Sequence, residues 1–139
     1  MPVVVEQLYD VSAQKIWNAL TNTDEMRKWY FDISDFKPVV GHEFKFLAGD
    51  DNQKWMHLCK VTAVEKEKMI AYDWRYDGYP GNSNVKFELI PQDGKTLLRV
   101  THTGLETFPQ DRKEFSQKSF EGGWTSILGE GLKNYLEDK

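Results

Sequence analysis

Few side chains of this chain could carry acid–base, nucleophilic or metal chemistry, and two histidines stand out among them. His57 and His102 lie in segments where apolar residues alternate with polar ones, so both are predicted to point into the protein interior. An imidazole there could act as a general acid or base. It could equally be a core histidine, hydrogen-bonded by its neighbours because a buried polar group needs a partner. The second interpretation is favoured for His102.

The spacing of the possible ligands and nucleophiles disfavours metal binding and nucleophilic catalysis. The chain has three histidines and one cysteine, with no His-x-His or His-x-x-x-His pair. Cys59 and the serines have no recognisable partner spacing, and no Gly-x-Ser-x-Gly turn occurs. The sequence therefore predicts no catalytic residue, no metal site and no cofactor.

Aromatic residues are the most informative part of the composition. The 139 residues include five Trp, six Tyr and eight Phe, and most of these rings should be structural because aromatic side chains dominate cores. A ring-lined cavity for a small, largely apolar molecule would also require aromatic residues beyond those of the core. The net charge of −4 and the lack of a basic stripe argue against nucleic acid as a partner.

Length and termini set the expected class of protein. A chain of 139 residues fits one domain, taken as residues 1–139. The N-terminus has neither a basic lead nor a long apolar run, and no segment approaches the roughly 20 apolar residues of a membrane span. The lone Cys59 cannot form an internal disulfide and is predicted to be buried. A cytoplasmic protein without stable membrane insertion is expected.

The N-terminal segment predicts one strand and two short helices. Residues 3–9 are rich in β-branched and apolar side chains, as in a strand. Ser12 is a suitable N-cap for a helix over residues 13–20, whose apolar residues fall at helical spacing. Residues 21–23 should end that helix and cap a second one, over residues 24–30, which has acidic residues in its first turn.

The central part predicts an antiparallel meander with one buried and one solvated face, because apolar and charged residues alternate there. Residues 65–68 and 92–94 read as turns between its strands. Residues 49–52 and 77–81 could be flexible loops at a cavity rim or ordinary hairpin turns. The residues predicted to face inward in the strands are Phe44, Phe46, Trp55, His57, Cys59, Val61, Tyr72, Trp74, Tyr76, Val85, Phe87, Leu89, Leu98, Val100 and His102.

The C-terminal segment predicts a long amphipathic helix. An apolar stripe starts at Trp124, continues through Leu128 and runs to Leu136. Gly122 and Gly123 should lie near the start of this helix, or allow another element to approach its backbone, since glycine disfavours a helix interior.

This order of elements resembles the START-like, helix-grip domains of the SRPBCC superfamily, in the branch of the Aha-type activators of the heat-shock protein 90 ATPase. The resemblance covers nearly the whole chain. Its motifs are Val11-Ser12-Ala13, Ile16 to Thr21, Trp29-Tyr30, Gly41 with Phe44 and Phe46, Tyr72 and Trp74, Val85 to Leu89, Thr101 to Gly104, and Gly123-Trp124.

The resemblance implies an α+β fold in which a curved antiparallel sheet wraps around the C-terminal helix, with an apolar pocket between them. Members of the superfamily bind lipids, sterols, polyketides or aromatic hormones, and some are cyclases or chaperone partners. Alternation along the strands and the helical stripe give the candidate ligand-binding residues, with Trp29 closing one end. They are Trp29, Phe44, Phe46, Trp55, His57, Tyr72, Trp74, Phe87, Val100, His102, Trp124 and Leu128.

Three functions follow, in descending order. The first is binding of a small hydrophobic molecule such as a lipid, aromatic or polyketide-like compound. The second, suggested only by the resemblance, is a chaperone-associated module. The third is a cyclase- or hydrolase-type enzyme that uses His57 or His102 as a general acid or base.

Overall fold

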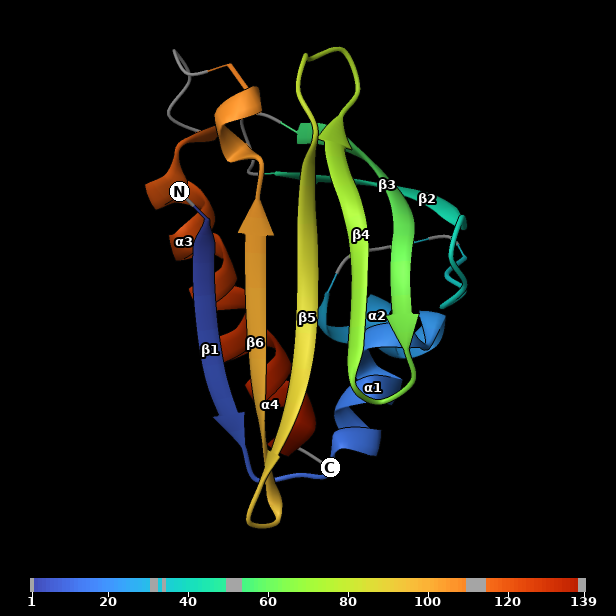
Figure 1. The fold of residues 1–139 in the computed structure, drawn as a ribbon, viewed down its shortest axis with the longest axis vertical. Coiled ribbons are helices and arrows are strands. Elements are labelled where there is room, and N and C mark those ends of the chain that lie inside the picture. Colours follow the sequence, from blue (N-terminus) through green and yellow to red (C-terminus); the bar gives the residue numbers. More distant parts are fainter. Residues whose placement is uncertain (1, 31–32, 34, 50–53, 110–114, 138–139) are drawn as a thin grey trace.

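The computed structural model of the protein describes residues 2–30, 33, 35–49, 54–109 and 115–137. Figure 1 shows a curved sheet whose helices gather on one side, so the molecule has two layers. The C-terminal helix lies behind β1 and β6 in this view, and the two short N-terminal helices lie behind the other end of the sheet. The fold is the predicted α+β helix-grip arrangement.

Six strands and six helical segments make up the described chain. The strands are β1 (Val3–Tyr9), β2 (Glu43–Gly49), β3 (Lys54–Glu65), β4 (Met69–Tyr76), β5 (Ser83–Gln92) and β6 (Lys95–Thr103). The helical segments are α1 (Ala13–Thr21), α2 (Thr23–Trp29), the 3₁₀ turn η1 (Leu105–Thr107), α3 (Gln117–Ser126), the π-helical segment η3 (Ile127–Leu132) and α4 (Lys133–Glu137).

The strands form one antiparallel sheet in the order β1-β6-β5-β4-β3-β2. Strands β2 to β6 are a meander, and β1 joins its far edge by pairing with β6, with Val5 opposite Val100. The predicted alternation is confirmed, because every strand residue expected to face inward is buried. These residues form one hydrophobic core with the apolar stripe of the C-terminal helix.

Local capping explains where the two N-terminal helices begin. The Ser12 hydroxyl accepts a hydrogen bond from the Lys15 backbone N–H at 3.2 Å, which satisfies a free amide of the first turn of α1. Asn22 does the same for Glu25 at 3.1 Å in α2. Both predicted helices and the capping role of residues 21–23 are therefore confirmed.

The C-terminal helix differs from the prediction at its start. It begins at Gln117, capped by Ser116, so Gly122 and Gly123 lie inside α3 rather than at its opening. No atom lies within 4 Å of the position where a Cβ on either glycine would be, so no described element approaches them closely. Helix initiation follows the Ser116 cap, which stabilises the first turn and outweighs the low helix propensity of two glycines.

A π-helical segment interrupts the same helix at η3. Within it Leu128 and Leu132 are fully buried, so the wider turn keeps the apolar stripe on the sheet. The Tyr9 hydroxyl donates a hydrogen bond to the Leu128 carbonyl at 2.7 Å, so β1 holds the helix at this turn. Such segments disturb the regular ladder of helical hydrogen bonds, so η3 is the least regular part of the helix.

The remaining turn predictions have separate outcomes. Residues 65–68 and 92–94 form turns, and residues 77–81 connect β4 to β5. Of the predicted loop 49–52, residues 50–52 lie outside the described residues. None of the described helices combines the length and apolar character needed to cross a bilayer.

Two glycine variants should change stability in opposite directions. Gly81 has φ near +105°, and a Cβ there would overlap the Thr107 carbonyl and lie 2.7 Å from Phe108 Cδ1. Gly81→Ala should therefore lower the free energy of unfolding by about 1–3 kcal/mol. Gly122→Ala, in open space within a helix, should raise it by about 1 kcal/mol. Urea denaturation measures both, and equal effects of the two variants would contradict this account.

Candidate functional site

The space between the sheet and the C-terminal helix contains the side chains predicted to bind a ligand. Eleven of the twelve are buried and come from β2 to β6 or from the C-terminal helix, while Trp29 is half-buried. Together with Tyr30 they form the ring layer, the name used below. Its members are Trp29, Tyr30, Phe44, Phe46, Trp55, His57, Tyr72, Trp74, Phe87, Val100, His102, Trp124 and Leu128.

His102 connects the helix to the sheet through a chain of hydrogen bonds. The indole N–H of Trp124 donates to His102 Nδ1 at 3.1 Å. On the other side of the ring, His102 Nε2 lies 2.8 Å from Ser83 Oγ, and the Ser83 hydroxyl donates to the Trp74 carbonyl at 2.6 Å. Three strands and α3 therefore meet at one imidazole.

The donors in this chain determine the tautomer of His102. An indole nitrogen can only donate, so Nδ1 must carry a lone pair and Nε2 must carry the proton. Because the Ser83 proton goes to the Trp74 carbonyl, its oxygen is left to accept from Nε2–H. The lone pair that a general base would use is therefore occupied by Trp124. This arrangement matches the core-histidine interpretation and gives Ser83 no base.

His57 lies in the same ring layer as His102, on β3 and closer to the β2 edge of the sheet. Its ring stacks on Phe46 with centroids 4.5 Å apart, and its edge faces Trp74 at 4.9 Å. Its Nδ1 is 2.9 Å from the Trp55 carbonyl oxygen. Burial lowers the pKa of His57 to about 4, although hydrogen bonds to the backbone of Trp55 and Phe46 oppose the shift. Burial likewise lowers the pKa of His102 to about 3. Both imidazoles are neutral at neutral pH.

A pair of tyrosines gives the ring layer a second polar feature. The hydroxyls of Tyr30 and Tyr72 are 2.8 Å apart and share a hydrogen bond. Burial raises both pKa values well above the usual value for tyrosine, so both phenols stay protonated. The Tyr30 ring is also stacked near Trp124, with centroids 6.4 Å apart. The pair therefore places two hydroxyls where the sheet, α2 and the helix converge.

Trp29 lies at the end of α2, beside Tyr30. Its indole N–H donates to the Ala19 carbonyl at 2.8 Å, and its ring stacks on Tyr30 at 4.9 Å. Its own carbonyl oxygen lies 3.2 Å from the position that a Cβ on Gly131 would occupy. The end of α2 thus packs directly on η3, and glycine at 131 permits this close approach.

Several buried or half-buried residues in or beside the layer were not among the predicted ligand-binding residues. The sequence places Tyr30 on the buried side of the second helix but gives no sign of a role in a site, and Ser83 has no apolar signal at all. Phe115 and Phe120 lie near the start of the C-terminal helix, outside the stripe that begins at Trp124, and both are buried. Tyr76 was predicted to face inward but was not taken as a candidate; it accepts a hydrogen bond from the Trp74 indole at 2.9 Å.

Among the described residues, the buried polar side chains of the layer are hydrogen-bonded. Every buried side-chain nitrogen or oxygen among the described residues has a hydrogen-bond partner. Nor do the described histidines, cysteine and carboxylates come together in any group of three or more that could hold a metal ion.

Comparison with protein families gives one match to nearly the whole chain. The family described as "Activator of Hsp90 ATPase homolog 1-like protein" matches residues 10–137. No curated protein matches the chain significantly.

Solved structures share the fold over its full length. A protein of Mesorhizobium loti, MLL2253, is 30% identical, with 100% of this chain and 98% of that one covered and a TM-score of 0.82. The solution structure of the Aha1 dimer from Colwellia psychrerythraea is 24% identical, covering 99% and 96% of the two chains at a TM-score of 0.73. CalU16 from Micromonospora echinospora is 20% identical, covering 97% and 75% at 0.76.

The two buried histidines should make the protein less stable in mild acid. Their unfolded pKa is about 6.5, so the unfolded chain binds protons that the folded chain excludes as pH falls below that value. Above about pH 6.5 both imidazoles are neutral in the folded and the unfolded chain, so they do not lower the free energy of unfolding. Below that value the free energy of unfolding falls, until the pH reaches about 4 for His57 and about 3 for His102. Each should cost about 1.4 kcal/mol per pH unit in this window.

Urea denaturation at about pH 7.5 and 5.5 measures this loss. His57→Phe keeps a ring on Phe46, and it should lose roughly half as much stability between the two pH values as the original protein does. Leu47→Gln, at an exposed position outside the ring layer, changes no titratable group and is the control, so it should leave the pH difference unchanged. An unaltered pH difference in His57→Phe would contradict the account.

Proposed function

The chain belongs to the family of Activator of Hsp90 ATPase homolog 1-like proteins, and on that premise we propose that it binds a small, largely apolar molecule between the sheet and the C-terminal helix. The observation that carries this proposal is the ring layer. Wide, flat side chains of the sheet and the helix, rather than direct backbone packing, lie between β2–β4 and the helix.

Aromatic side chains suit a site that admits a guest. Each turns about only two side-chain bonds, so a ring can swing aside while its neighbours stay in place. Tyr30 and Phe46 have centroids 6.2 Å apart, and Trp74 and Trp124 are 5.5 Å apart. A planar or chain-like ligand that replaces such contacts gains about 0.8 kcal/mol for each CH₂ it buries.

The helix that covers the layer also supports the proposal. Segment η3 breaks the regular α-helical ladder, and Gly129 and Gly131 lie within it. Displacing the helix at this point costs fewer regular hydrogen bonds than displacing it within α3. Entry of a ligand beside η3 would still leave the Trp124–His102 hydrogen bond in place.

The Tyr30–Tyr72 pair provides orientation for one polar atom of the ligand. A phenol oxygen has two acceptor lone pairs, so each can accept from a ligand O–H while their mutual hydrogen bond remains. The preferred ligand is therefore mainly apolar, with a hydroxyl or amine at one end.

Binding of 2-naphthol and naphthalene tests this site. In protein labelled at methyl groups, 2-naphthol should shift the NMR signals of Val100 and Leu128, which are fully buried, and not those of Val4 and Leu47, which are exposed. Tyr72→Phe should weaken 2-naphthol binding about 3–10-fold through loss of one hydroxyl and leave naphthalene binding unchanged. Saturable shifts confined to exposed methyls, or no shift at all, would overturn the proposal.

A chaperone-associated role is the second candidate, favoured by the family and by two exposed valines. Val39 and Val40 are consecutive and 59% and 61% exposed, just before β2. Adjacent apolar side chains in such a position suit a protein partner. The description of the family, Activator of Hsp90 ATPase homolog 1-like protein, suggests the partner class, an Hsp90-type ATPase.

An ATPase assay with a bacterial Hsp90 separates the two candidates. If the second role holds, saturating protein should raise ATP turnover, and a variant with both Val39→Ser and Val40→Ser should raise it less. Tyr72→Phe, altered only inside the ring layer, is the matched control and should stimulate normally. An unchanged turnover at saturation would rule this role out, and the ligand proposal would be unaffected.

A further inference from the structure

We propose that the outer face of the sheet holds a second site, which binds a small organic anion with a carboxylate or phosphate group and a short apolar body. The site is a depression of about 490 Å³ over β2, β3 and β4, on the side of the sheet away from the ring layer. Its volume is in the range of small-molecule sites. The residues around it are Glu43, Phe44, Lys45, Leu58, Cys59, Lys60, Asp73, Arg75 and Asn82.

Strand register places two cations on either side of one apolar side chain. Lys45 is opposite Leu58 in the β2–β3 pair, and Leu58 is opposite Arg75 in the β3–β4 pair. The side chains of all three point to the outer face of the sheet. The residues next to them in the sequence, Phe44, Cys59 and Trp74, face inward and are buried. The row therefore reads cation, apolar side chain, cation across three strands.

The same row ends in an amide. Strands β4 and β5 are antiparallel, and Trp74 lies opposite Ser83. One position further along each strand, Arg75 therefore lies beside Asn82. Asn82 is exposed and also lines the depression. An amide N–H next to a guanidinium adds a further donor for an oxyanion.

The neighbouring row has its charges balanced. Lys60 lies between Glu43 on β2 and Asp73 on β4. Asp73 also accepts a hydrogen bond from Asn84 at 3.3 Å. Carboxylates on both sides compensate the Lys60 charge, so this row does not compete for an anion. It borders the site and repels a second anionic group.

Lys45 and Arg75, by contrast, have no carboxylate directly opposite them on a neighbouring strand. Among the described residues, neither side chain takes part in an ion pair. On a protein with a net charge of −4, two cations about two strand spacings apart form a local positive potential. Arg75 can hold a carboxylate or phosphate through two parallel hydrogen bonds, with Lys45 as a point charge on the other side.

Leu58 favours a ligand with an apolar part next to its anionic group. Its side chain is half-buried between the two cations, and a ligand lying over it would remove its remaining apolar surface from water. An anion with a short chain or ring should therefore bind more tightly than a bare inorganic ion. A carboxylic acid and a phosphate monoester share this chemistry, so both are tested.

The experiment follows backbone amide NMR signals during titration with hexanoate, phenyl phosphate, inorganic phosphate and the neutral hexanamide. Hexanoate or phenyl phosphate should give saturable shifts at residues 43–45, 58–60 and 73–75, and whichever binds more tightly identifies the acid group. Hexanamide should not shift these residues, and inorganic phosphate should bind at least about 3-fold more weakly than phenyl phosphate.

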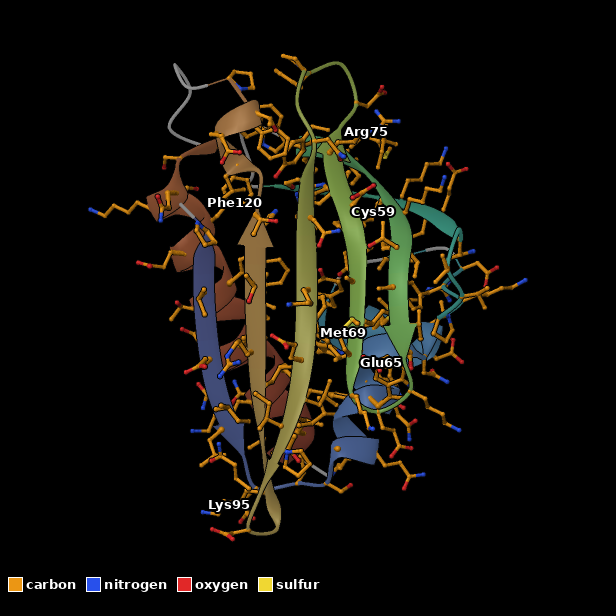
Figure 2. All side chains as sticks on the ribbon, viewed as in Figure 1. Cys59, Glu65, Met69, Arg75, Lys95 and Phe120 are labelled. Carbon is orange, nitrogen blue, oxygen red and sulfur yellow. The ribbon has the colours of Figure 1, made fainter. Side chains whose placement is uncertain are left out.

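Variants on the outer face keep the test independent of folding. Arg75→Gln and Lys45→Gln change exposed side chains, and each should weaken binding about 5-fold or more. Lys95→Gln is the matched control and should have no effect, since Lys95 lies in the hairpin at the opposite end of the molecule from Arg75 (Figure 2). Binding should also weaken as salt is raised.

Three results would overturn this second site. They are equal binding of hexanamide and hexanoate, an equal loss of affinity in Lys95→Gln and Arg75→Gln, and no saturable shift at these strands. Failure here leaves the inner site untouched, because the reporters of that site are the Val100 and Leu128 methyls on the opposite face.

Discussion

The neutral imidazole of His102 is the contact on which the two-layer arrangement depends. It is hydrogen-bonded to the C-terminal helix through the Trp124 indole, and it reaches β4 and β5 through Ser83. The geometry works for one protonation state only. A proton on Nδ1 would face the indole N–H, and two donors repel each other. The burial that keeps this ring neutral is therefore part of what positions the helix over the sheet.

Around that fixed point the ring layer explains how a helix can cover a strongly curved sheet. Curvature leaves unequal gaps between the two layers, and side chains of different width fill them. Close to β1 the helix packs against the sheet, with Gln7 Oε1 3.8 Å from the position that a Cβ on Gly129 would occupy. Near β2 to β4 the gap is wider, and Phe46, Trp74 and Tyr72 fill it. The same chain thus combines a rigid edge with a side whose packing depends on rotatable rings.

The sequence predicted the parts of this fold that follow from period and capping. Every residue that alternation named as inward-facing in the meander is buried, and Ser12 and Asn22 marked two helix starts, because these signals are local. It could not place the start of the C-terminal helix at Gln117, since two glycines obscured the signal of the Ser116 cap. The π-helical segment contacts Tyr9 through Leu128 and Trp29 through Gly131, and both partners lie more than 100 positions away in the sequence. Ser83 and Tyr30 gain their place only from tertiary partners. The role of the ring-layer residues in binding stays a prediction.

A strand with a period of two gives one sequence two independent surfaces, and this protein uses them differently. Along β3, the Cys59 side chain is buried on the inner face while Leu58 and Lys60 face outward, so adjacent side chains lie on different faces of the sheet. On the inner face, burial disfavours charge, so both histidines are neutral at neutral pH. Outside, water screens charge, so Lys45 and Arg75 can remain uncompensated at little cost. A ligand chosen by the inner face must be mainly apolar, whereas one chosen by the outer face must be an anion. Since a single position along the strand decides between these environments, a substitution at Leu58 or Arg75 alters one face without changing the side chains that line the other.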